Sequence, residues 1–236
     1  MLTLLGLGLV AGVLTTIAGM GGGLLLVVVL SAWQGPHFAL AVTTPALLVA
    51  NVHRAWLFRR DVNTQVAKAF ALGAIPGAFV AGWLVPRLPE IVLQIVLVGA
   101  TLLTLARAIG WVRLSPGRGA ITTGGAGIGV LCATAGGAGV LTAPLFLSAG
   151  LSGAAYVGTV ALGAVSLHLG RVLGYGAGGL FALSFVTPML LLTVGIVAGN
   201  FAGKGLRKSL DAQTEARVEM GALVLCTALS LLGLGK

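Results

Sequence analysis

The chain has 236 residues, of which 58% are hydrophobic and only 8% are charged, and its formal net charge is +9. Soluble domains contain about 25% charged residues, so this composition excludes an ordinary soluble domain. A basic charge can indicate a nucleic-acid partner in a soluble protein. In a membrane protein it follows from Lys and Arg in cytoplasmic loops, so we expect a lipid bilayer around the chain and no nucleic acid.

Apolar runs cover most of the chain, and short polar or Pro/Gly segments separate them. The runs span residues 2–33, 38–58, 66–85, 90–110, 120–149, 154–175, 180–203 and 214–235. Most are about 20 residues long, the length of a helix that crosses a hydrocarbon core of about 30 Å. Backbone groups in lipid must be satisfied internally, and these runs lack the alternation of strands. The sequence therefore predicts an all-α polytopic membrane protein.

The first and fifth runs are longer than one membrane crossing needs, and each contains a glycine cluster. Residues 19–23 read Gly-Met-Gly-Gly-Gly, and residues 136–139 read Gly-Gly-Ala-Gly. Each glycine costs about 1 kcal/mol relative to alanine inside a helix, so a cluster favours a break. We expect each run to form a glycine-broken segment, either re-entrant or discontinuous, followed by three transmembrane helices.

The two long runs also match each other at an offset of 117 residues. Eleven of the 25 positions from 8 to 32 are identical to their counterparts, among them Gly12 and Gly129. Matches at offset 115, such as His53 with His168, and at offset 122 extend the similarity. Self-similarity of this kind indicates duplication. We predict a first repeat at residues 1–112, a linker at 113–117 and a second repeat at 118–236, together forming one transport domain.

The distribution of basic residues favours an inverted second repeat. If every run crosses the membrane once, the 14 Lys and Arg residues divide nine to five between the two sides. If each long run returns to the side it entered, or crosses twice, they divide eleven to three, with Arg87, Arg171 and Lys236 in the minority. Short cytoplasmic loops carry an excess of Lys and Arg, so the second arrangement is favoured.

Interrupted helices at corresponding places in two repeats are typical of binding sites in transporters. A broken helix presents free N–H groups and a positive dipole end, which suit a small anion. The alternative role of the glycines is close helix packing, which we assign to rows such as Gly73/Gly77 and Gly195/Gly199/Gly203. Polar residues on the runs at 38–58 and 154–175 could line the pathway or hydrogen-bond between helices. The candidate substrate-binding residues are Gly19, Gly21, Gly22, Gly23, Gly136, Gly137, Gly139, Thr44, Asn51, His53, Thr159, Ser166, His168 and Arg171.

Two arginines lie toward the ends of these polar runs. Arg54 is close in sequence to Arg59 and Arg60, and we expect it to extend with them to the membrane surface. Arg171 has almost no other charge near it in the sequence, which makes it a candidate counter-charge for an anion.

Asp and Glu are missing from the middle of the apolar runs, so a carboxylate relay for a coupling ion is poorly supported. Any coupled proton would have to be carried by His53 or His168. The spacing around Cys132 and Cys226 indicates neither a metal site nor a redox motif, and we expect no cofactor. The oligomeric state stays open, and a homo-oligomer is compatible with the sequence.

The cluster Gly19 to Gly23 and the apolar stretch after it resemble the TauE/SafE (TSUP) family of sulfite exporter-like membrane permeases. The resemblance covers the whole chain, because that family carries a glycine cluster followed by proline near the start of each of two repeats. Val27 stands where the first proline is usual, and Pro144 is present in the second copy. The second cluster has Ala138 and Val140 opposite Gly21 and Gly23. The resemblance implies multi-pass insertion in the inner (plasma) membrane and export or uptake across it of sulfite, thiosulfate, organosulfonates or related anions.

Three classes of function stay open at this point. A secondary transporter would bind a small anion between the broken segments and alternate its access by rocking of the repeats. An anion channel shares these features but would conduct without saturating. An intramembrane enzyme would need a pair such as Ser166 and His168 or Ser148 and His168. Neither pair has the sequence context of a nucleophile, so we expect no enzyme.

Overall fold

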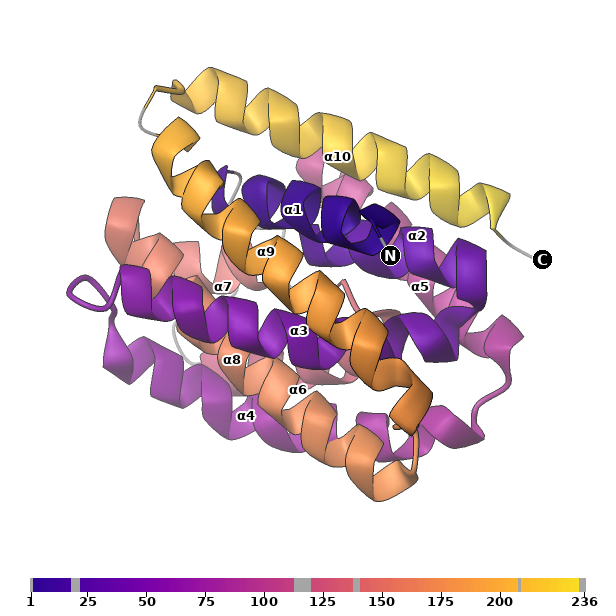
Figure 1. Cartoon of the computed structure of the whole chain (residues 1–236). Coiled ribbons are helices and arrows are strands. Elements are labelled where there is room, and N and C mark those ends of the chain that lie inside the picture. Colours follow the sequence, from indigo (N-terminus) through magenta and orange to yellow (C-terminus); the bar gives the residue numbers. More distant parts are fainter. Residues whose placement is uncertain (1, 18–21, 113–119, 138–140, 208, 234–236) are drawn as a thin grey trace.

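The computed structural model describes residues 2–17, 22–112, 120–137, 141–207 and 209–233, and all regular structure within these ranges is helical (Figure 1). The helices begin and end within a few residues of the predicted apolar runs. In chain order they are α1 (Leu2–Ile17), α2 (Gly22–Gln34), α3 (Pro36–Leu57), α4 (Thr64–Leu84), η1 (Val85–Arg87), α5 (Glu90–Ala108), α6 (Ala120–Ala135), α7 (Thr142–Ser148), α8 (Gly153–Gly178), η3 (Leu183–Phe185), α9 (Val186–Arg207) and α10 (Ala212–Leu232).

Local sequence explains several helix ends. Helix α3 begins at Pro36, which has no N–H to leave unsatisfied in the first turn, directly after Gly35 with φ of 84°. The side chain of Asn63 caps α4 by accepting a hydrogen bond of 3.1 Å from the backbone N–H of Val66. Gly179 ends α8 with φ of 81°, a left-handed conformation that favours glycine.

Five helical segments of the described chain are long and apolar enough to cross a membrane. They are Pro36–Leu57, Thr64–Arg87, Glu90–Ala108, Gly153–Gly178 and Leu183–Arg207. Helices α1, α2 and α6 are apolar but shorter, with 16, 13 and 16 residues. These lengths and compositions fit the predicted polytopic, all-helical membrane protein.

Two tryptophan–arginine pairs lie at opposite ends of the bundle. The guanidinium of Arg59 is 4.8 Å from the ring centre of Trp56 near the end of α3. The guanidinium of Arg87 is 4.5 Å from the ring centre of Trp83 near the end of α4, which runs back from α3. Tryptophan and arginine are enriched where membrane meets water, so the pairs fit the two interfaces.

Glycines let α1 pack closely on α9. A Cβ atom at Gly12 would overlap the carbonyl oxygen of Ile196 and lie 3.0 Å from the Cα of Gly199. A Cβ atom at Gly8 would lie 3.1 Å from the Cα of Gly195. The predicted packing role of the Gly195/Gly199 row is confirmed. Because the contacts advance in the same direction along both helices, α1 and α9 are parallel.

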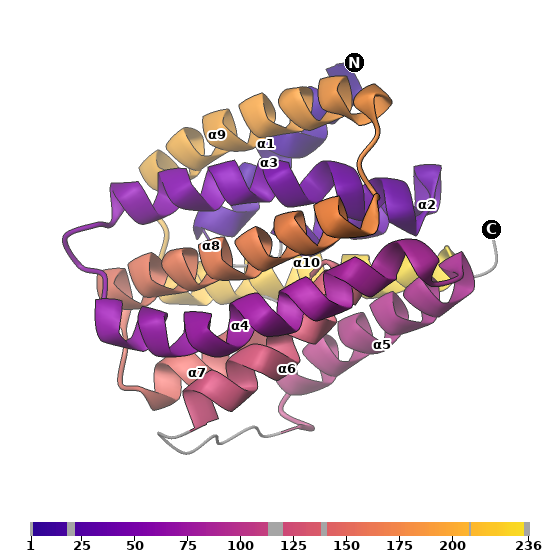
Figure 2. The ribbon, with the colours of Figure 1, turned by 90° about the horizontal axis from the view of Figure 1, so that it is seen from below.

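The same kind of contact joins α4 to α6. A Cβ atom at Gly73 would overlap the carbonyl oxygen of Thr122, and one at Gly77 would overlap that of Ala126. Helices α4 and α6 are therefore also parallel, and the packing role predicted for Gly73 and Gly77 is confirmed. Figure 2 shows α4 lying along both α6 and α8.

Helix α8 runs parallel to α4 and antiparallel to α3. The contacts between α4 and α8 advance from Gly170 against Ile75 to Gly178 against Pro86. At the other face of α8, Gly158 lies against Phe58, close to the C-terminal end of α3. Helix α3 is in turn parallel to α9, because the side chain of Asn200 donates to the carbonyl of Ala50 and Lys204 lies 6.0 Å from the ring centre of Phe58.

Candidate functional site

Two glycines of the first cluster, Gly22 and Gly23, lie at the start of α2, which packs on α1. A Cβ atom at Gly22 would overlap both the carbonyl oxygen of Ala11 and the hydroxyl of Thr15. A Cβ atom at Gly23 would meet only the flexible side chain of Leu47, at 3.2 Å. Gly22 is therefore required for close packing of α2 on α1, whereas Gly23 has more room. The candidates Gly19 and Gly21 lie outside the described residues.

The second cluster packs against α2, the helix that follows the first cluster. Gly136 has φ of 74°, and a Cβ atom there would lie 2.5 Å from a methyl group of Val27. A Cβ atom at Gly137 would overlap the side chain of Leu24. The described glycines of the two clusters, Gly22, Gly23, Gly136 and Gly137, thus lie in one region of the bundle around α2. The candidate Gly139 lies outside the described residues.

Arg171 on α8 is the centre of a buried polar cluster next to Gly136. Its side chain is 0% exposed. Its Nε donates to the Tyr175 hydroxyl at 3.2 Å, and its Nη1 donates to His168 Nδ1 at 3.1 Å and to the Gly136 carbonyl at 3.5 Å. Its Nη2 has no hydrogen-bond partner among the described residues. One edge of the guanidinium is thus held in place, and the other can bind a further acceptor.

The cluster ties α8 to the end of α6. The Tyr175 hydroxyl donates to the carbonyl of Ala133, and the Cys132 sulfur lies 3.9 Å from Arg171 Nη1. Because arginine only donates hydrogen bonds, Nδ1 of His168 accepts. The imidazole is therefore neutral, with its proton on Nε2.

The charge of Arg171 has no carboxylate partner in the part of the chain that the structure describes. The ion pairs there are His37 Nδ1 with Glu90 at 3.3 Å and Arg207 Nε with Glu215 at 3.1 Å. The side chains of both pairs are partly exposed to solvent, unlike that of Arg171. An isolated buried charge is costly unless an opposite charge or strong hydrogen bonds compensate it. A small anion bound at Nη2 would supply both an opposite charge and a hydrogen-bond acceptor.

The prediction that Arg54 extends to the membrane surface is wrong. It is only 3% exposed, so it does not extend to the surface with Arg59 and Arg60. Its Nη1 donates to the Thr15 carbonyl at 2.9 Å, and its Nη2 donates to the Asn51 side-chain oxygen at 2.8 Å. Helical side chains lean toward the N-terminus of their helix, which takes Arg54 back into the bundle, where the end of α1 offers an acceptor.

Arg54 and Arg171 occupy matching positions at the offset of 117. Asn51 and His168 have the same offset, and each bonds to the arginine three residues later. Sequence reasoning missed this because it aligned His53 with His168 at offset 115. His53 instead packs against Phe201 of α9, with ring centres 4.6 Å apart, and neither ring nitrogen has a hydrogen-bond partner among the described residues. Applying the offset of the broken segments to α3 and α8 would have found Arg54.

The remaining polar candidates are buried, and each donates a hydrogen bond to a carbonyl of its own helix. Thr44, Asn51, Thr159 and Ser166 donate to the carbonyl four residues earlier, at 2.6, 2.7, 2.6 and 3.3 Å. Thr44 lies beside the Tyr175 hydroxyl, close to the arginine cluster. Thr159 accepts from the backbone N–H of Asn63 at 2.9 Å, so it lies at the start of α4 and apart from that cluster.

The serines of the enzyme alternative make no hydrogen bond to His168 among the described residues. Ser166 donates to the Leu162 carbonyl at 3.3 Å, and Ser148 donates to the Leu145 carbonyl at 2.9 Å. The described residues also contain no group of three His, Cys, Asp or Glu side chains that could hold a metal ion.

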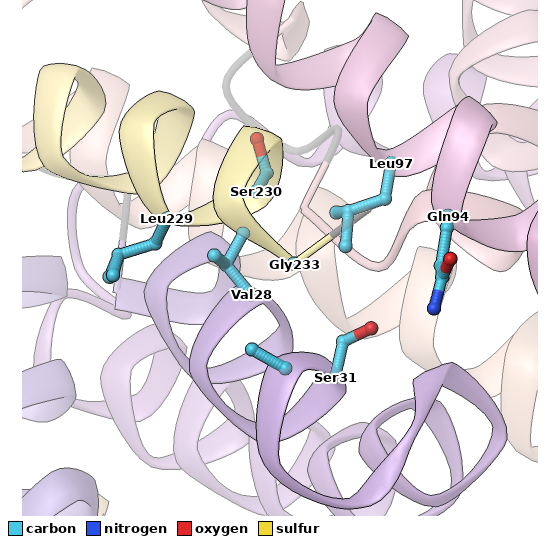
Figure 3. Close-up of a pocket in the computed structure, with 8 residues that line it drawn as sticks. Val28, Ser31, Gln94, Leu97, Leu229, Ser230 and Gly233 are labelled. Atoms are coloured by element: carbon cyan, nitrogen blue, oxygen red, sulfur yellow. The ribbon is translucent and has the colours of Figure 1, made fainter. Parts of the chain in front are cut away.

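A separate small pocket lies between α2, α5 and α10 (Figure 3). Ser31, Gln94 and Ser230 line it together with apolar side chains, and no charged side chain faces it. It has room for about one water molecule, which is too little for an oxyanion. This pocket offers an anion no positive charge, whereas the arginine cluster does.

The apolar helices define a multi-pass helical membrane protein, and the buried arginine cluster is its candidate interior site. The chain belongs to the sulfite exporter TauE/SafE family, whose model matches residues 4–231, as the glycine clusters predicted. This is a family of sulfite exporter-type membrane transporters. No curated protein and no solved structure matches the chain.

Proposed function

We propose that this protein is a secondary transporter that carries a small sulfur oxyanion or sulfonate, such as sulfite, thiosulfate or an organosulfonate, across the inner membrane. The observation that carries the proposal is Arg171, a fully buried cation whose Nη2 has no partner among the described residues. Arginine presents paired N–H groups that match the oxygens of an oxyanion.

The distribution of acidic residues supports an anionic substrate. The chain has five Asp and Glu residues, at positions 61, 90, 211, 215 and 219, and all of them lie in loops or within the first eight residues of a helix. The interior of the bundle therefore contains the buried Arg54 and Arg171, but no Asp or Glu lies at the middle of a helix to balance their charge. A bound anion offsets that charge, and its negative charge is in turn stabilised by the guanidinium.

The helix directions support an inverted pair of repeats. The matched segments are α1 with α6, α3 with α8, and α4 with α9. Helices α1, α3 and α9 are parallel to one another, as are α6, α8 and α4, and the two sets run in opposite directions. Each helix thus runs opposite to its counterpart in the other repeat. Rocking of inverted repeats around a central site is a common basis of alternating access.

The positions of the loops support the assignment of the cytoplasmic side. Loop 59–63 carries Arg59 and Arg60, and α9 ends at Arg207 beside the same end of α3. Figure 1 shows loop 59–63 and the C-terminal end of α9 at the same end of the bundle. An excess of Lys and Arg marks the cytoplasmic side, so we place this end inside the cell.

Cysteine labelling tests this orientation. We expect Asp61→Cys and Asp211→Cys to react with an impermeant thiol reagent only from the cytoplasmic side, because both residues are exposed at that end. Leu183→Cys, at a residue that is 93% exposed at the opposite end, should react only from outside. Cys132 and Cys226 are buried and can stay in place. Labelling of positions 61 and 211 from opposite sides would refute the inverted arrangement.

Flux measurements test the function itself. Purified protein in proteoliposomes is expected to take up sulfite at an initial rate that saturates with concentration, because each turnover must bind one anion and change conformation. Liposomes without protein give the background. Linear, non-saturating uptake at high rate would identify an anion channel, and uptake equal to the background for sulfite, thiosulfate and an organosulfonate would reject the proposed substrate class.

A further inference from the structure

We propose that Arg54 is a second anion-binding residue, and that Arg54 and Arg171 together hold one small oxyanion where α3 crosses α8. The inference rests on the proposed function at Arg171. It adds the other repeat's arginine to the site and describes the ligand as an oxyanion whose oxygens accept hydrogen bonds from two guanidinium groups.

The register of α3 and α8 places the two arginines at neighbouring levels. Phe58 lies opposite Gly158, and Thr44 lies beside Tyr175. With a rise of 1.5 Å per residue, the two contacts put the backbones of Arg54 and Arg171 about 9–14 Å apart along the helix axes. Side chains on a helix lean toward its N-terminus. Because α3 and α8 are antiparallel, the two arginine side chains lean toward each other.

His168 lies between the two charges. It lies one turn from Arg171 along α8, toward the level of Arg54, and bonds directly to Arg171. The imidazole is neutral, so it offsets neither guanidinium charge. An anion between two cations in a low-dielectric interior is attracted by both of them. The same central position therefore suits the anion for both arginines.

Each arginine also contacts the end of the helix that precedes its repeat's glycine cluster. Arg54 donates to Thr15 of α1, and Arg171 donates to Gly136 just after α6. An anion held by both side chains would thus be linked to both predicted breaks. A purely structural Arg54 would hold α1 in place but would leave anion affinity unchanged.

The experiment compares Arg54→Gln, Arg54→Lys and Arg171→Gln with the parent protein, with Arg59→Gln as the control. Arg59 is exposed one turn further along and stacks on Trp56, so its replacement should leave anion binding unchanged. The readouts are the KM for sulfite in proteoliposomes and the rise in Tm that sulfite causes in detergent. A structural role would lower the Tm without sulfite but would not change this rise.

We expect Arg54→Gln to raise the KM about 10- to 100-fold and to remove most of the sulfite-dependent rise in Tm. Arg54→Lys, which keeps the charge but not the paired N–H geometry, should lie between the parent and Arg54→Gln. A parent-like KM and Tm rise in Arg54→Gln, while Arg171→Gln loses both, would overturn this inference alone. A parent-like KM in Arg171→Gln would overturn the proposed function. If Arg54→Gln does not fold, parent-like values in Arg54→Lys are the overturning result.

Discussion

Replacing Arg171 with glutamine is expected to abolish saturable sulfite transport while the protein still inserts and folds. Glutamine can keep hydrogen bonds within the cluster, but it removes the positive charge and the free Nη2 edge. Hydrogen bonds to charged groups contribute about 1.5–3 kcal/mol each, so the loss of one lowers anion affinity by about 10- to 150-fold. The measurement is the initial rate of sulfite uptake over a range of concentrations, normalised to the amount of folded protein.

Arg87→Gln is the matched control for this experiment. Arg87 is an arginine of η1 that lies over the ring of Trp83 at the end of the bundle, and its replacement should leave the KM unchanged. If Arg171→Gln lost folded protein in the same proportion as transport, the cluster would serve only to hold α6 on α8. The proposed binding role would then be rejected.

Alanine at Gly12 is expected to cause a large loss of stability. The added Cβ would overlap the Ile196 carbonyl, and because this is backbone, α1 and α9 would have to move apart. Overpacking of this kind costs about 1–3 kcal/mol. Gly77→Ala should have a similar effect, because its Cβ would overlap the carbonyl of Ala126 at the matching α4–α6 contact. The measurement is the Tm of the purified protein, followed by tryptophan fluorescence.

Gly6→Ala on the same helix is the control. No atom lies within 4 Å of a Cβ at Gly6, so alanine there adds helix propensity without a clash. We expect a gain of up to about 1 kcal/mol for Gly6→Ala. Equal Tm values for Gly6→Ala and Gly12→Ala would show that the α1–α9 contact is not as close as the structure has it.

The sequence predicts the helices well because the membrane imposes simple rules. Long apolar runs become helices, and separators such as Gly35-Pro36 and Asn63 end or cap them. The glycine rows were also predictable as packing contacts, because small residues four apart form a groove on one helix face. The sequence could not identify the partner of each groove, since Gly12 and Gly199 are 187 residues apart and only the fold brings them together.

The candidate site was predicted in part. Arg171, His168 and Gly136 lie together as a polar cluster, whereas His53 and Thr159 lie elsewhere. Arg54 was misjudged because its neighbours in sequence are exposed, whereas its environment depends on where α1 ends. Burial of a side chain near a helix end depends on tertiary contacts, which composition and spacing do not report.

The crossed packing of the helices has a consequence for how the protein is made. Helix α1 leaves the ribosome well before α9, which begins at Val186, yet α1 packs closely on α9. Helix α4 likewise packs on α6, which lies beyond the linker. The glycine faces of α1 and α4 therefore lack their partner helices until α9 and α6 have been synthesised. These contacts form only after α9 has been synthesised, so we expect the first half of the chain to reach its final packing only together with the second.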